Sequence, residues 1–168
     1  VRARPTRTRE ALTLVDAVTG EDRFERVDWH SALALDIEAS RSRPCGYLLA
    51  PGQEAVVARL QSLGVRVDAQ DRERRAVVER YRIVSERGGQ RLDARGAIAA
   101  RRAIRELSVA LDRSGGTLPA AGWWIGMDQP LANLVAAALE PDSQNSYVAN
   151  HVMELETGSL LRVLSWMD

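Results

Sequence analysis

The sequence contains no lysine: all 23 of its basic residues are arginine, and 23 acidic residues balance them to a net charge of zero. Arginine binds carboxylates and phosphates through planar, bidentate contacts. A chain without a basic surplus, however, lacks the charge of a general nucleic-acid-binding protein. We therefore expect no nucleic-acid partner, and we attribute the uniform use of arginine to the base composition of the gene.

Other scarce features exclude further classes. Cys45 is the only cysteine, so no disulfide forms within the chain and the compartment cannot be read from its cysteine content. No apolar run approaches the ~20 residues that a membrane-spanning helix needs, so we expect no membrane partner. The N-terminal residues lack the basic, apolar and small-residue pattern of a signal peptide, so we expect no leader peptide in this sequence. Because the first residue is Val1 rather than methionine, we expect a processed product or a piece of a longer protein.

The remaining composition is that of a globular domain. The chain has 168 residues, of which 45% are hydrophobic and 27% are charged, which is enough for one domain with a core. Residues 1–10 are rich in arginine and lack apolar periodicity, so we predict a frayed end or a linker there. Residues 11–168 are predicted to form a single domain.

Strands dominate the predicted secondary structure. Alternating apolar residues such as Val27, Trp29, Leu33, Leu35 and Ile37 indicate half-buried strands. The predicted strands cover residues 11–15, 24–38, 46–49, 65–67, 77–86, 102–113, 123–125 and 160–165, with glycine-containing turns at 88–89 and 114–116. Residues 96–105 are ambiguous, because their alanine content also favours a helix.

Two helices complete the prediction. Val56, Val57 and Leu60 recur at helical spacing, which predicts a helix over about 53–63 that Gly64 ends. The second helix is predicted over about 129–140, with Asp128 as its N-cap and Pro141 at its end. The predicted fold class is therefore α+β, a mostly antiparallel sheet with two main helices.

The second helix follows a segment that has an earlier counterpart. Gly46–Gln53 (GYLLAPGQ) aligns without gaps on Gly122–Gln129 (GWWIGMDQ), and each segment is preceded by a long predicted strand. This similarity suggests two related strand–strand–helix units. Two similar turns that arose independently are the alternative.

No residue pattern predicts catalysis or metal binding. The two histidines, His30 and His151, lack a second ligand at the spacing of known zinc motifs, so a surface and a packed histidine are the better interpretations. Ser143 and Ser146 are not in a Gly-x-Ser-x-Gly elbow. Nothing in the sequence marks Cys45 as a low-pKa thiol. We predict no catalytic residue, no metal ligand and no cofactor in this chain.

Six residues are candidates for binding or interface contacts. Trp123 and Trp124 should face opposite sides of a strand, so one of them is a candidate for an interface with a neighbouring domain. The polar loop after the second helix is the other candidate contact surface. It contributes Glu140, Asp142, Ser143 and Ser146.

Two segments together resemble a known family. Arg43–Leu49 (RPCGYLL), followed by a predicted helix and Leu63-Gly64-Val65, resembles a recurring segment in long bacterial zinc carboxypeptidase-like proteins of the carboxypeptidase A-like family. So does Gly122–Ala132, which ends in QPLA, followed by Leu139–Ser146 (LEPDSQNS). The similarity is to the region C-terminal to their peptidase domain. The resemblance covers roughly residues 24–165. The family's His-x-x-Glu zinc motif, later histidine ligand and general-base glutamate are not present, so no catalytic residue is carried over.

The resemblance implies a non-catalytic C-terminal domain that packs against the peptidase domain in cis and supports it. Zinc is then expected in the peptidase domain of the parent protein, and an exported parent is implied because such exopeptidases are often exported. A free-standing module that binds a peptide or a glycan, through Trp123 or Trp124 and the 140–146 loop, is the alternative. A deep aromatic-lined pocket would favour this module, and a flat apolar surface would favour docking.

Overall fold

The computed structural model describes residues 2–93, 96–97 and 103–167. The chain divides into two compact units, which are described separately. One contains Val1–Arg41 and Leu92–Ala97, and the other contains Ser42–Arg91 and Ile98–Asp168. This division differs from the predicted single domain, because the N-terminal strands pair with each other and do not join the larger sheet.

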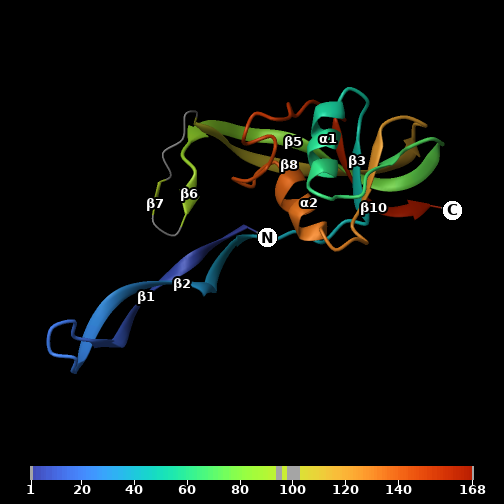
Figure 1. The fold of residues 1–168 in the computed structure, drawn as a ribbon. Helices are drawn as coiled ribbons and strands as arrows, with labels where there is room; N and C mark the ends of the chain where they lie inside the picture. Colours follow the sequence, from blue (N-terminus) through green and yellow to red (C-terminus); the bar gives the residue numbers. More distant parts are fainter. Residues whose placement is uncertain (1, 94–95, 98–102, 168) are drawn as a thin grey trace. The chain divides into compact units, whose positions relative to one another are not determined.

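The first unit is built on a long β-hairpin (Figure 1). Strand β1 (Arg2–Val15) pairs antiparallel with β2 (Asp22–Ala39), with register shifts between Arg2 and Ala3 and between Pro5 and Thr6. The predicted frayed end over residues 1–10 is therefore wrong for the described residues, because backbone pairing with β2 orders them without apolar periodicity. Two short strands, β6 (Leu92–Asp93) and β7 (Gly96–Ala97), form a separate small pair.

The second unit, which we call the sheet unit, contains a six-stranded sheet in the order β4-β9-β3-β10-β5-β8. Every neighbouring pair in it is antiparallel. Its strands are β3 (Gly46–Leu49), β4 (Asp68–Ala69), β5 (Arg74–Gly89), β8 (Ile104–Leu118), β9 (Trp123–Gly126) and β10 (Leu160–Met167). The α+β prediction with a mostly antiparallel sheet is confirmed.

Both helices pack on one face of this sheet (Figure 1). Helix α1 (Glu54–Ser62) and helix α2 (Ala132–Leu139) bury apolar residues in one large core with residues of the strands. Leu60, Val135 and Leu139 are fully buried in this core. The opposite face of the sheet carries a smaller core that includes Leu48 and Val163.

The first helix lies within its predicted range, and Gly64 follows it as predicted, with a φ of 87°. The predicted strand over 65–67 is wrong. The amides of Gly64 and Val65 instead bond to the carbonyls of Gln61 and Leu60, so these residues complete the end of α1. The strand begins later, at Asp68.

The second helix begins three residues later than predicted, and Asp128 does not cap it. The N-cap is Leu131, which makes no side-chain cap hydrogen bond. Gln129 explains the delay, because its side chain donates to the carbonyl of Gly126 at 2.7 Å and accepts from the amide of Arg66 at 2.8 Å. These bonds hold the start of the segment as a turn that is anchored to the neighbouring chain.

Two predicted turns are parts of strands. Residues 88–89 lie in β5, and residues 114–116 lie in β8, where they pair with residues 76–78 of β5. Glycine keeps both backbone hydrogen-bonding groups, so it does not interrupt a ladder by itself. Half of the ambiguous stretch 96–105, residues 98–102, lies outside the described residues, and its described ends belong to β7 and to the start of β8.

The predicted internal repeat is present only as strand–helix pairs. Strand β3 leads into α1 and β9 leads into α2, and β3 pairs antiparallel with β9. The preceding long strands do not correspond, because β2 pairs with β1 whereas β8 pairs with β5.

Candidate functional site

Trp123 and Trp124 belong to opposite faces of the sheet, as predicted from their places in a strand. Trp123 packs against the large core under the helices, and Trp124 packs against the smaller core on the other face. Both side chains are half-buried. Each tryptophan therefore has a packing partner within the sheet unit.

Trp124 is part of an aromatic stack that includes Trp166. The centroids of their rings are 5.0 Å apart at an angle of 58°, and the guanidinium of Arg74 lies 3.6 Å from the centroid of the Trp166 ring. Gly46 provides room for the Trp124 ring, since a Cβ there would lie 2.2 Å from a ring carbon. The stack covers the smaller core and is not arranged around an empty aromatic pocket.

The loop after α2 uses its polar groups inside the domain. Ser146 is fully buried, its hydroxyl donates to the carbonyl of Pro141 at 3.0 Å, and it accepts from the amide of Ala149 at 3.0 Å. The hydroxyl of Ser143 accepts from the amide of Asn145 at 3.3 Å. Asp142 and Ser143 are half-buried. The loop is thus closed by its own hydrogen bonds.

Glu140 belongs to a polar cluster around the buried Arg162, which we did not predict from the sequence. Its carboxylate accepts from the hydroxyl of Tyr47 at 2.8 Å, and Nε of Arg162 lies 3.0 Å from the same oxygen. Arg162 also pairs with Glu79 and donates to the carbonyl of Ser42. The Arg162 side chain is 2% exposed, and both glutamates are 17% exposed.

The cluster has two carboxylates for one guanidinium. Burial opposes the charge of Arg162, but the surrounding groups, Glu140 foremost among them, together raise the pKa of Arg162. Burial and the charge of Glu140 raise the pKa of Tyr47, and the same two causes raise the pKa of Tyr81. Both phenols therefore stay protonated at neutral pH. A single arginine in the otherwise apolar run LLRVL was the available signal for this cluster.

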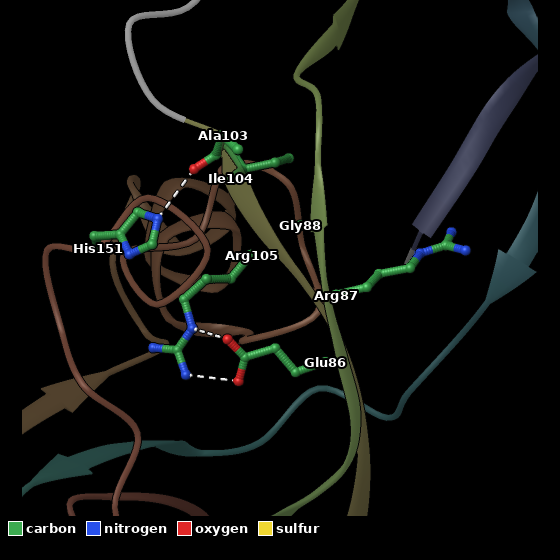
Figure 2. A pocket seen from close by; sticks show the side chains of 7 residues that line it. All are labelled: Glu86, Arg87, Gly88, Ala103, Ile104, Arg105 and His151. Atoms are coloured by element: carbon green, nitrogen blue, oxygen red, sulfur yellow. Dashed lines mark hydrogen bonds and ion pairs between the residues drawn. The ribbon is translucent and has the colours of Figure 1, made fainter.

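A cavity of about 450 Å³ lies where β5 ends and β8 begins (Figure 2). Glu86, Arg87, Gly88, Ala103, Ile104, Arg105 and His151 line it, so it has no tryptophan, tyrosine or phenylalanine among these described lining residues. Figure 2 shows Arg87 directed away from His151 and Arg105. The lining also lacks a serine, threonine, cysteine or lysine that could act as a nucleophile.

The charged side chains around this cavity form ion pairs with one another. Arg105 donates to both carboxylate oxygens of Glu86, at 2.7 and 2.9 Å, and to Glu154 at 2.7 Å. Its hydrogen bond lowers the pKa of Glu86. His151 has a φ of 58°, and its Nε2 lies 3.0 Å from the carbonyl oxygen of Ala103. These contacts connect β5, β8 and the 147–155 segment. Among the described lining residues, no side chain is arranged as a catalytic nucleophile, acid or base.

The remaining candidate residues are placed as follows. Cys45 is exposed, and its thiol donates to the carbonyl of Leu164 at 2.9 Å. The side chain of His30 is outside the described residues. Within the described part of the chain, no group of three or more His, Cys, Asp or Glu residues could hold a metal ion. No helix there is long and apolar enough to cross a membrane.

Comparison of the chain with protein-family models, curated proteins and solved structures finds no match.

Proposed function

We propose that this chain is a non-catalytic accessory domain of a zinc carboxypeptidase-like protein, which packs against the peptidase domain and supports its fold. One observation carries the proposal. The residues through which the sequence resembles the region after the peptidase domain have structural tasks in the sheet unit. Gln129 anchors the start of the α2 segment, Glu140 pairs with Arg162, and Ser146 closes the following loop.

This observation gives a reason for the same motif to be present in several proteins although it contains no catalytic residue. A buried hydroxyl with two hydrogen bonds and a half-buried carboxylate paired with a buried arginine preserve a fold, because leaving either partner unsatisfied costs free energy. In this proposal, the motif preserves an architecture that the chain shares with that region. The catalytic zinc site belongs, in this proposal, to the peptidase domain of the parent protein.

The geometry also favours docking over a ligand-binding module. The aromatic side chains named above pack on each other or on the cores, and aromatic rings do not line the described cavity. Exposed apolar side chains instead concentrate in the N-terminal unit. It holds seven of the ten exposed large apolar residues of the described chain. Such concentrations mark interaction surfaces.

The test is to purify the full chain and the peptidase domain of the parent protein separately and to mix them. We expect a complex by calorimetric titration and a higher melting temperature of the peptidase domain, since a ligand that binds only the folded state stabilises it. Absence of both effects would contradict the proposal. Zinc-dependent peptidase activity of the chain alone, which persists through purification and disappears with a chelator, would also contradict it.

A further inference from the structure

The outer part of the β1–β2 hairpin exposes apolar side chains on both faces. We call residues 10–27 the hairpin arm. Val15 is 70% exposed and Phe24 is 78% exposed. Register places Thr13 opposite Phe24 and Glu10 opposite Val27. Opposite residues share a face and successive residues alternate, so Val15 and Phe24 lie on one face, whereas Leu14 and Val27 lie on the other.

This pattern differs from that of a hairpin with one solvent-exposed face, in which apolar and polar residues alternate along each strand. A strand that is apolar on both faces is typical of strands covered on both sides. The described residues of this unit provide no second layer over the arm, and a two-stranded hairpin alone is marginally stable in water. The arm therefore has the composition of an element that is covered on both faces, and the described residues of its own unit do not cover it.

The end of the arm is ordered by its own turn. One carboxylate oxygen of Asp16 accepts from the amides of Val18 and Thr19, at 2.9 and 3.0 Å. The backbone of Asp16 also bonds to Glu21 and Gly20. The turn presents Val18, which is 94% exposed, at the end of the arm. A preorganised apolar end lowers the entropy cost of binding.

The charge of the arm restricts its partner. Residues 10–27 contain five acidic side chains and two basic ones, a net charge of −3. The acidic residues are Glu10, Asp16, Glu21, Asp22 and Glu25, and the basic ones are Arg23 and Arg26. This surplus repels an identical arm and the anionic surface of a membrane. It is complementary to a cleft that has apolar walls and a basic rim.

We propose that the hairpin arm inserts into an apolar cleft with a basic rim on the peptidase domain, an inference that rests on the proposed function. Phe24 and Val15 contact one wall, Leu14 contacts the other, and Val18 enters deepest. The carboxylates of Glu21 and Asp22 contact the basic rim. The sheet unit then serves as the scaffold that carries the arm.

The test uses the full chain, the purified peptidase domain and calorimetric titration. Phe24→Ser and Val15→Ser should each weaken binding at least about tenfold, as expected for apolar interface anchors. The matched control is Val84→Ser in β5, a strand valine of the sheet unit that is 61% exposed. We expect it to leave the dissociation constant within about twofold, because it lies outside the arm.

Charge provides a second set of variants that leaves the apolar residues intact. Asp22→Arg should weaken binding, and raising the salt concentration should weaken binding of the unaltered chain, because exposed charge pairs are screened. Hydrogen exchange of the hairpin amides in each free variant shows whether the hairpin still forms. A variant with a formed hairpin and unchanged affinity counts against the inference.

The outcomes separate the two proposals. No complex with the unaltered chain would overturn both. A complex that Phe24→Ser, Val15→Ser and Asp22→Arg all retain would overturn only the insertion of the arm. A dimer of the chain that Phe24→Ser dissociates, detected by light scattering, would assign the arm to a second copy. Binding of the arm to lipid vesicles without the peptidase domain would assign it to a membrane, and either result would overturn the inference.

Discussion

The hairpin and the sheet unit use strands of similar length but differ in what covers them. Strands β1 and β2 have 14 and 18 residues, and strands β5 and β8 have 16 and 15. In the sheet unit, residues of one strand such as Leu48 and Leu49 are buried in separate cores on the two faces. In the hairpin, Leu14 and Val15 are both exposed. Apolar content alone therefore does not tell whether a face is covered.

The largest expected loss of stability follows from a substitution at the charge cluster around Arg162 in the sheet unit. Arg162→Ala should lower the free energy of unfolding by about 3–5 kcal/mol, because it leaves Glu79 and Glu140 without their cationic partner. Denaturant unfolding followed by circular dichroism measures this loss. The control is Arg82→Ala, whose pair with Asp112 is exposed and should contribute only about 0–1 kcal/mol. Equal losses for both variants would contradict the structural importance of the cluster.

A matched pair of leucines compares the two regions directly. Leu139 is fully buried, whereas Leu14 is 44% exposed. Leu139→Ala should cost about 2–5 kcal/mol of stability, since it removes core contacts and leaves a cavity. Leu14→Ala should cost no more than about 0.5 kcal/mol in the isolated chain. Thermal unfolding of the two variants side by side makes the comparison, and a large loss for Leu14→Ala would show that the hairpin is covered in solution.

The smallest expected effect concerns the turn of the hairpin. Hydrogen bonds from the amides of Thr19 and Val18 lower the pKa of Asp16 below its ordinary value of 3.8. A lowered folded-state pKa means that the carboxylate supports the turn above pH 3.8 and loses this effect as the pH falls through the lowered value. Amide exchange at Val18 and Thr19 should therefore speed up, after correction for intrinsic exchange rates, only in that acidic range.

Asp16→Ala provides the control for this pH dependence. In that variant the two amides should exchange faster at neutral pH and show no further acid-induced change of protection. The sheet unit should keep its protection in both proteins. A turn that keeps its protection in Asp16→Ala would show that the backbone bonds alone define it.

Patterns with a local cause were predictable from the sequence. The apolar spacing of Val56, Val57 and Leu60 identified α1, and the short apolar run over residues 123–125 identified β9. The errors came from tertiary contacts. Gln129 holds the start of the α2 segment through Arg66, which is 63 residues away in sequence, so Asp128 lost its predicted capping position. A pattern within one segment contains no information about such a partner.

The candidate site shows the same limit. The strand position of Trp123 and Trp124 predicted their opposite faces, and periodicity sufficed for that. Glu140 was a surface candidate, yet it pairs with Arg162 of β10, and only the order of strands in the sheet brings these two residues together. The interface roles predicted for Trp123, Trp124, Asp142 and Ser143 stay predictions. The exposed arm was not predicted, because strand alternation was interpreted as half-burial.

The place of β10 in the sheet has a consequence for synthesis. Of the strands of the sheet unit, β10 is synthesised last, yet it lies between β3 and β5 and pairs with both. Until Met167 has been synthesised, the sheet unit lacks the strand that connects β3 to β5. The unpaired edges of β3 and β5 are open to mispairing during that time. The hairpin needs only residues 2–39 and can form much earlier. Chaperone binding should accordingly persist on the sheet unit after the hairpin has formed.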